Sequence, residues 1–224
     1  MSVLERLRGR LIVSVQPEDA SVLAAPETIA LLARCAVQNG AGGMRVEGVE
    51  RIRAVRAAVD VPIVGLIKRS PSGFRPYITT SLDDVEAICG AGAEIVAFDA
   101  TLRPRAGGAT VAEIVDRAQR LGRLAFADCA TIEDCHAAVA VGADLVATTL
   151  AGYTTETTGR SLPDINLVGA LAQLHPFAVC EGGITEPDQV RAAFMAGASA
   201  VVVGTAITNV DALTRRFAGV CPAI

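Results

Sequence analysis

Two segments in the carboxyl-terminal part of the sequence combine glycines with residues that could bind an anion. Glu181-Gly182-Gly183 closes one apolar run, and Gly204-Thr205 closes the next. Glycine N–H groups that no side chain shields can point at an anion. The last two loops of a barrel of parallel strands and helices commonly form a phosphate site. The pattern therefore predicts that Gly182, Gly183, Gly204 and Thr205 bind a phosphate.

Lys68 and Glu181 are the candidates for moving a proton. Lys68 follows an uninterrupted apolar run, where an ammonium group would be partly desolvated and its pKa lowered toward the range of a useful base. Glu181 stands in similar surroundings, and burial would raise the pKa of its carboxyl toward neutrality. General acid-base catalysis requires a base and an acid of this kind. We therefore predict that Lys68 and Glu181 are the catalytic residues.

Polar residues stand at the ends of six apolar runs. They are Gln16, Arg45, Lys68, Asp99, Asp128 and Glu181. If these runs are parallel strands of one barrel, the residues converge on one mouth, where the active sites of such barrels lie. Two of them also have purely structural interpretations. Asp128 could cap the helix that follows it, and Arg45 could pair with Glu47.

Eight short apolar runs alternate with segments of helical periodicity. The runs are continuous, which is typical of parallel strands buried on both faces. Helical segments begin at N-cap candidates followed by acids, as at Ser81 and Thr131. Three of them end at a glycine that leads into the next strand, namely Gly92, Gly142 and Gly197, and glycine readily adopts the left-handed conformation that ends a helix.

The chain length and composition agree with this pattern. The 224 residues suit one α/β barrel, and a chain that is 51% hydrophobic but only 4% aromatic suits buried strands beside small-residue helices. We predict an α/β fold, a single (β/α)8 TIM barrel domain over residues 1–224 with a short N-terminal helix at its bottom. An open doubly wound sheet is the alternative.

Several classes of function are disfavoured. The net charge is −4 and the arginines are dispersed, which argues against nucleic-acid binding. No segment resembles a signal peptide or reaches a membrane-spanning length. The six cysteines form no C-x-x-C pair, so the usual zinc sites and redox dithiols are not expected. We expect a cytoplasmic protein with reduced thiols and without a metal or cofactor.

The motifs together resemble those of the N-acylglucosamine-6-phosphate 2-epimerases, which interconvert N-acetylmannosamine 6-phosphate and N-acetylglucosamine 6-phosphate in sialic acid catabolism. The resemblance covers nearly the whole chain. Its pieces are Val15-Gln16, Gly42-Gly43-Met44-Arg45-Val46-Glu47-Gly48, Pro62-Ile63-Val64-Gly65-Leu66-Ile67-Lys68, Tyr77-Ile78-Thr79, Phe98-Asp99-Ala100-Thr101 with Arg103-Pro104, Ala127-Asp128-Cys129, Thr148-Thr149-Leu150-Ala151-Gly152-Tyr153-Thr154 and Glu181-Gly182-Gly183-Ile184.

The resemblance implies a role for each matched residue. Lys68 and Glu181 would transfer protons at C2 through an enolate, and the glycine amides would hold the phosphate of a sugar-phosphate substrate. The residues that would hold the sugar are Gln16, Arg45, Asp128, Tyr77 and Thr149. One position departs from the family pattern, since Asn209 stands where the family commonly carries an arginine that reaches the phosphate.

Other interpretations remain open at this stage. A different phosphate-binding barrel enzyme, such as a synthase of the tryptophan or thiamine pathways, would share the last two loops. A non-catalytic sugar-phosphate binding module would have no need of Lys68 or Glu181. A purely structural barrel would have no reason to collect six polar groups at one mouth. An apolar helix face could pack on a neighbouring copy, so a homodimer is compatible with the sequence.

Overall fold

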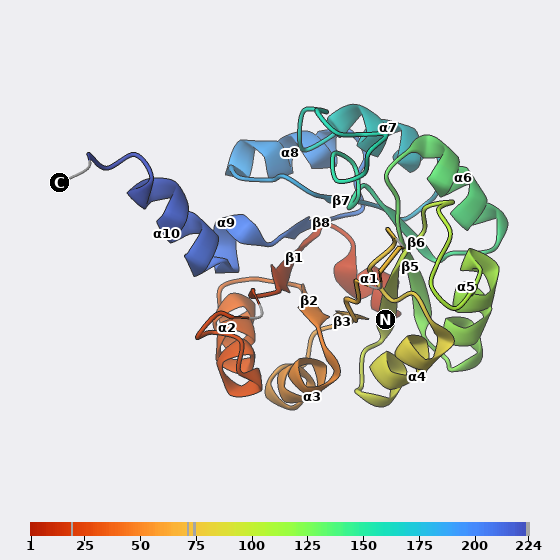
Figure 1. Cartoon of the computed structure of the whole chain (residues 1–224), viewed down its shortest axis with the longest axis horizontal. Helices are drawn as coiled ribbons and strands as arrows, with labels where there is room; N and C mark the ends of the chain where they lie inside the picture. The colour runs from red at the N-terminus through yellow and green to blue at the C-terminus, as the bar shows by residue number, and fades with distance from the viewer. Residues whose placement is uncertain (19, 71, 74, 223–224) are drawn as a thin grey trace.

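The computed structural model of the chain describes residues 1–18, 20–70, 72–73 and 75–222. Eight parallel strands form a closed barrel in sequence order, in which β8 pairs with β1, and helices surround it (Figure 1). The prediction of a (β/α)8 barrel is confirmed, and the open sheet is excluded. The strands are β1 (Arg10–Val15), β2 (Gly43–Glu47), β3 (Ile63–Leu66), β4 (Ile95–Asp99), β5 (Leu124–Asp128), β6 (Leu145–Ala147), β7 (Ala178–Glu181) and β8 (Ala200–Val203).

The helices follow the predicted order, and the short N-terminal helix is present. They are α1 (Val3–Leu7), α2 (Pro26–Gln38), α3 (Val49–Ala58), α4 (Leu82–Gly90), α5 (Val111–Arg120), α6 (Ile132–Ala140), α7 (Ile165–Leu174), α8 (Pro187–Met195), α9 (Thr205–Thr208) and α10 (Val210–Ala218). Ser81 and Thr131 cap α4 and α6 as predicted, because their hydroxyls accept from backbone N–H groups in the first turn. None of the described helices has the length and apolarity needed to cross a membrane.

Glycines allow the tight joints and close packing between helices and strands. Gly92, Gly142 and Gly197 have φ values of 99°, 87° and 102°, so the predicted left-handed helix ends are confirmed. Within β3, a Cβ on Gly65 would lie 2.6 Å from a methyl carbon of Ile88 in α4. Glycine at this position therefore lets α4 pack directly on β3, the strand that leads to Lys68.

The hydrophobic core has two layers because the strands are buried on both faces. One cluster fills the barrel interior and includes Phe126 and Phe177, with Leu7 of α1 buried among them. A second cluster lies between the strands and the surrounding helices and includes Ile29 and Ile88. Apolar burial of this extent is the main favourable term in folding. The packed core also fixes the position of the carboxyl ends of the strands, where the polar residues lie.

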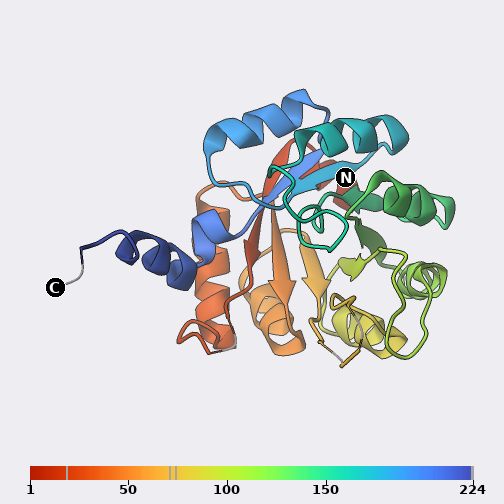
Figure 2. The same cartoon turned by 45° about the horizontal axis from the view of Figure 1, so that its top comes forward.

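The C-terminal segment departs from the pattern of the other helices. α9 follows β8 directly, and α10 then points away from the barrel (Figures 1 and 2). The Asn209 side chain caps α10 by accepting from the Ala212 N–H at 2.9 Å. Asp211 accepts from the Ser21 hydroxyl at 2.6 Å, and Arg215 pairs with Glu18. These contacts tie α10 to the loop after β1.

Candidate active site

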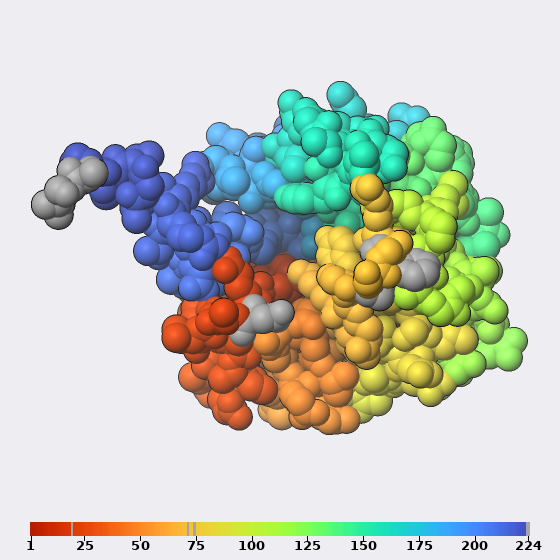
Figure 3. All heavy atoms as spheres, viewed as in Figure 1, coloured from red at the N-terminus to blue at the C-terminus, as the bar shows by residue number. Residues whose placement is uncertain are grey.

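One cavity of about 560 Å³ opens at the carboxyl ends of the strands, a volume suited to a small ligand. Figure 3 looks onto this face, which is hollowed between the blue C-terminal segment, the orange N-terminal segment and the yellow segment after β3. All predicted site residues except Asp128 line the cavity. These lining residues are Gln16, Arg45, Lys68, Tyr77, Thr149, Glu181, Gly182, Gly183, Gly204 and Thr205.

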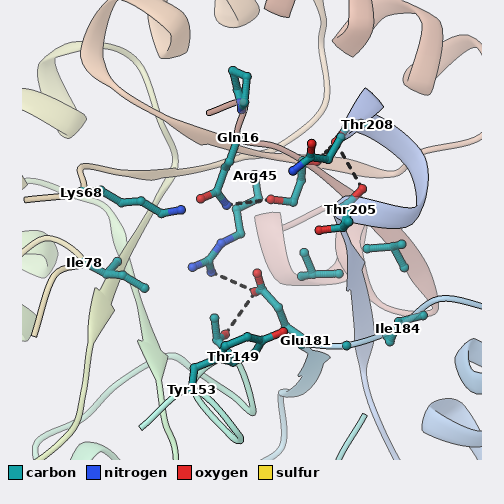
Figure 4. A pocket seen from close by; sticks show the side chains of 18 of the residues that line it. Gln16, Arg45, Lys68, Ile78, Thr149, Tyr153, Glu181, Ile184, Thr205 and Thr208 are labelled. Atoms are coloured by element: carbon teal, nitrogen blue, oxygen red, sulfur yellow. Dashed lines mark hydrogen bonds and ion pairs between the residues drawn. The ribbon is translucent and has the colours of Figure 1, made fainter. Parts of the chain in front are cut away.

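Arg45 occupies the centre of the site (Figure 4). It lies within β2, so its side chain rises from the barrel interior rather than from a loop. Its guanidinium binds Asp128 through both terminal nitrogens, at 3.1 and 2.8 Å, and lies 3.1 Å from Glu181 Oε2. It also stacks over the Phe126 ring at 5.2 Å. Burial opposes the charge, but Asp128 and Glu181 outweigh it and raise the pKa of Arg45.

Asp128 lies behind Arg45 and does not line the cavity. It is fully buried, and both of its carboxylate oxygens accept from the guanidinium. The sequence left open that Asp128 caps the following helix and that Arg45 pairs with Glu47, and both of these interpretations are wrong. Thr131 rather than Asp128 caps the following helix, and Glu47 pairs with Arg51 instead of Arg45. The burial of the Arg45 cation is offset by the buried Asp128 carboxylate and by the partly buried carboxylate of Glu181.

Asp99 also lies outside the cavity, contrary to the prediction that all six strand-end residues converge on it. It is fully buried at the end of β4. One carboxylate oxygen accepts from the Thr101 N–H and hydroxyl, and the other pairs with Arg103 at 3.1 Å. Asp99 therefore organises the loop after β4.

Glu181 ends β7 and is held from two sides. Thr148 fixes its backbone, since the Thr148 hydroxyl donates to the Glu181 carbonyl at 2.8 Å and accepts from its N–H at 3.1 Å. The Thr149 hydroxyl donates to Oε2 at 3.2 Å. Burial raises the pKa of Glu181 to about 7, against the opposing effect of Arg45. A carboxyl with this pKa is available in both protonation states near neutral pH.

Lys68 follows β3 and extends into the cavity from the side opposite Glu181 (Figure 4). Although the Lys68 side chain reaches into an open cavity and is exposed to solvent, partial desolvation lowers its pKa, and the positive charge of Arg45 adds to this effect, whereas Glu47 and Glu181 oppose it. The predicted direction is therefore correct. Burial raises the pKa of the neighbouring Tyr77 to about 12, so its phenol remains a hydrogen-bond donor.

The side of the cavity formed by the loops after β7 and β8 is built mainly from backbone. Gly182 and Gly183 have φ values of 106° and 72°, a conformation that side chains disfavour. Gly204 comes close to β1, since a Cβ on it would lie 3.2 Å from that of Ser14. Thr208 of α9 secures this approach by donating to the Ser14 carbonyl at 2.7 Å.

Two residues that contact the predicted site residues could hardly be found from the sequence. Ser14 interrupts an apolar strand, and its hydroxyl accepts from Gln16 Nε2 at 2.7 Å, so a polar residue in that run was the available signal. Thr148 belongs to a motif of the resemblance, yet nothing in the sequence links it to the Glu181 backbone. Among the described residues, no group of three or more His, Cys, Asp or Glu side chains could hold a metal ion.

Comparison with other sequences identifies a family. The family model described as "Putative N-acetylmannosamine-6-phosphate epimerase" matches residues 29–221. A Synechococcus elongatus protein named "Putative N-acetylmannosamine-6-phosphate 2-epimerase" is 48% identical over 218 residues, which cover 96% of this chain and 94% of that protein. The Bifunctional enzyme NanE/NanK of Brucella melitensis is 42% identical over 215 residues. That match covers 96% of this chain but 41% of the bifunctional enzyme, so the chain spans less than half of this relative.

Comparison with solved structures agrees. The N-acetylmannosamine-6-phosphate 2-epimerase from Clostridium perfringens superimposes with a TM-score of 0.94 at 34% identity, covering 99% of this chain and 97% of that chain. Thiamine phosphate pyrophosphorylase from Pyrococcus furiosus gives a TM-score of 0.63 at 14% identity, covering 91% and 88% of the two chains; this likeness concerns the fold alone. Fold, cavity and sequence together show that this chain belongs to the N-acetylmannosamine-6-phosphate epimerase family.

Proposed function

We propose that the chain interconverts N-acetylmannosamine 6-phosphate and N-acetylglucosamine 6-phosphate. The observation that carries this proposal is the placement of Lys68 and Glu181 on opposite sides of one cavity, with Arg45 between them (Figure 4). The environment lowers the pKa of Lys68 and raises that of Glu181. Such a pair can remove a proton from one face of a carbon and return one to the other.

The reaction requires no change in oxidation state. In the open-chain sugar, C2 bears the N-acyl group and lies next to the C1 aldehyde. Removal of the C2 proton leaves an enolate, and reprotonation on the other face gives the epimer. Neutral Lys68 is the base in one direction and protonated Glu181 the acid, and the roles reverse in the other direction. Each turnover moves one proton from C2 to Lys68 and one from Glu181 to C2, and exchange with solvent then restores both groups, so no redox cofactor is needed.

Arg45 stabilises the negative charge that develops on oxygen. Arg45 lines the cavity and is held by Asp128 and Glu181, so its fixed positive charge lies next to a bound substrate. Asp128 acts on the sugar through Arg45, because it fixes the guanidinium without lining the cavity. Gln16, Tyr77 and Thr149 line the cavity and bind the sugar hydroxyl and N-acyl groups.

The phosphate binds at the backbone-lined side. We name the two parts of the cavity by their residues: the proton-transfer end comprises Arg45, Lys68 and Glu181, and the anion end comprises Gly182, Gly183, Gly204 and Thr205. At the anion end, backbone N–H groups and the Thr205 hydroxyl are suitable donors to a dianion. Asn209 also lines the cavity, but its side-chain oxygen is occupied by the cap of α10.

A coupled assay for N-acetylglucosamine 6-phosphate tests this function. We expect the chain to form it from N-acetylmannosamine 6-phosphate, and in D₂O the product should carry deuterium at C2. Product that fully retains the original hydrogen would argue against exchange through an enolate. Equal turnover of the unphosphorylated sugar would show that the anion end is not a phosphate site. A binding module or structural barrel would give no turnover, and a synthase or lyase would leave C2 stereochemistry unchanged.

The chain also carries a surface suited to a second copy of itself. α10 points away from the barrel, and its Phe217 side chain is 70% exposed. Val210 of the same helix and Val220, which follows it, are also exposed. A homodimer that buries these side chains would remove this apolar surface from water. Phe217→Glu should therefore shift the mass measured by light scattering from dimer to monomer, whereas Leu102→Glu, at another exposed apolar residue, should not. A monomeric unaltered chain would overturn this proposal.

The single-domain organisation and the location are further parts of the proposal. All eight strands belong to one closed barrel, which supports one domain over residues 1–224. The six cysteines are free, and unpaired thiols suit the reducing cytoplasm.

A further inference from the structure

Thr79 adopts a backbone conformation that its residue type disfavours. It is the non-glycine residue with a positive φ in the described chain, at 43°, and it is fully buried. A β-branched side chain in the left-handed region carries a free-energy cost, which glycine or asparagine would reduce. Strained residues of this kind persist where surrounding contacts hold them, and they concentrate at functional sites.

The contacts of Thr79 converge on the residue before Lys68. Its N–H donates to the Ile67 carbonyl at 2.8 Å, and its hydroxyl accepts from the Ile67 N–H at 3.2 Å. Both backbone groups of Ile67 are thus held by this one residue. β3 ends at Leu66, so these bonds continue the order of the strand up to Lys68.

The residue after Lys68 is held by the same returning segment. The Arg69 N–H donates to the Tyr77 carbonyl at 2.8 Å, and Lys68 itself bridges Ile78 in an antiparallel arrangement. The returning segment is in turn fixed to β4, because the Asp99 N–H donates to the Ile78 carbonyl at 2.9 Å. Lys68 therefore emerges from a backbone that is secured on both sides and anchored to the barrel.

We propose that Thr79 is a positioning residue for Lys68. The Thr79 hydroxyl holds the Ile67 peptide and thereby directs the Lys68 ammonium group into the cavity for proton transfer. This proposal rests on the role of Lys68 in the proposed function. Threonine satisfies the Ile67 N–H, which glycine cannot do, and this explains why a strained side chain occupies a position that glycine would fit more easily. A shift of about 1 Å in a reacting group can cost about a hundredfold in rate.

Three substitutions separate the hydroxyl from the backbone strain. Thr79→Val keeps the shape and removes the hydroxyl, Thr79→Gly removes both hydroxyl and strain, and Thr79→Ser keeps the hydroxyl. We expect kcat to fall about ten- to a hundredfold in the valine and glycine variants, with KM within about twofold, and serine to retain kcat within about threefold. Thr80→Val, at the adjacent buried threonine, is the matched control and should change kcat less than twofold.

The pH profile gives a readout that a purely structural role would not move. A Lys68 side chain that moves away from Arg45 and the cavity wall would lose both effects that lower its pKa, so the pKa would rise toward the ordinary value. The acidic limb of kcat should then move to higher pH in the valine and glycine variants. The charged and titratable groups around the ammonium are Arg45 and Glu47 of β2, Asp128 of β5, Glu181 of β7 and Tyr77 of the returning segment.

The outcomes distinguish this proposal from the role of Lys68 itself. Wild-type kcat in Thr79→Val and Thr79→Gly would overturn it, as would activity losses that follow melting temperature alone and leave the pH profile unchanged. In a Lys68→Ala background, Thr79→Val should cause no further loss of kcat, since the group that it positions is absent. A fully active Lys68→Ala variant would instead refute the catalytic role of Lys68.

Discussion

The two ends of the cavity handle charge by different means. At the proton-transfer end, Arg45 of β2 is fully buried and pairs with Glu181 of β7, and Lys68, which follows β3, extends into the same cavity. At the anion end, glycines and a threonine line the cavity. Among the described residues that line the cavity, the lysine and arginine side chains are Lys68 and Arg45. The cations of the site are therefore concentrated at the end where protons move.

This difference follows from what each end must do. Proton transfer near neutral pH needs pKa values far from those in water, and burial, close charges and hydrogen bonds provide them. Binding of a phosphate needs donors in fixed positions, which backbone N–H groups supply without a net charge. The proton-transfer end should therefore be sensitive to single atoms, whereas the anion end should tolerate the loss or gain of one side chain.

Removal of Lys68 should give the largest effect. Lys68→Ala should keep the fold but lower kcat by at least about 10²- to 10⁴-fold, the usual contribution of general acid-base catalysis. Lys68→Arg should be comparably inactive, because a guanidinium stays protonated and cannot act as a base. The coupled assay measures turnover, and thermal unfolding provides the control for folding. Near-normal turnover of either variant would remove Lys68 from the mechanism.

Protonation of Glu181 should affect the pH dependence of stability. The folded chain holds this proton up to about pH 7, whereas an ordinary glutamate releases it near 4.5. The folded state binds more protons in this window, so this group makes the free energy of unfolding fall as pH rises from about 4.5 to about 7. The change amounts to about 3 kcal/mol.

Urea unfolding at several pH values across that window measures this effect. Glu181→Gln removes the titrating group, so the difference in stability between it and the unaltered chain should change with pH in the stated direction. A difference that is constant across the window would show that the pKa of Glu181 is not raised.

A cation at the anion end should have a moderate effect on binding. Asn209→Arg should lower KM by no more than about ten- to a hundredfold, as a charge-assisted hydrogen bond allows, with little change in kcat. Loss of the Asn209 cap on α10 should cost about 1 kcal/mol of stability. Steady-state kinetics and thermal unfolding measure the two effects separately. A large change in kcat would contradict the independence of the two ends.

A matched pair of threonine substitutions should give the smallest effects and the sharpest comparison. Thr149→Val removes the bond to Glu181 Oε2, so it should shift the pH profile and alter kcat. Thr205→Val removes a hydroxyl from the anion end and should raise KM a few-fold with kcat unchanged, about the contribution of one hydrogen bond. Identical kinetic changes in the two variants would show that the ends do not act separately.

Much of the site could be predicted from local patterns. Continuous apolar runs and glycine helix ends are local consequences of backbone chemistry, so the barrel followed from them. The barrel then placed Lys68, Glu181 and the glycines at one mouth, because parallel strands all end there. The partners of these residues were less predictable. The pairing of Arg45 with Asp128 joins β2 to β5 across the barrel interior, and no local pattern specifies such a contact.

The sequence by itself determined the fold, the face that carries the cavity and the residue types available there, since these depend on periodicity and on residues near one another in the chain. Only the tertiary structure decided which charges meet. It placed Asp128 behind Arg45, turned Asp99 toward Arg103, directed Thr79 to Ile67 and sent α10 away from the barrel. Burial, strand register and hydrogen bonds between distant segments set these contacts, and they exist only once the barrel has closed.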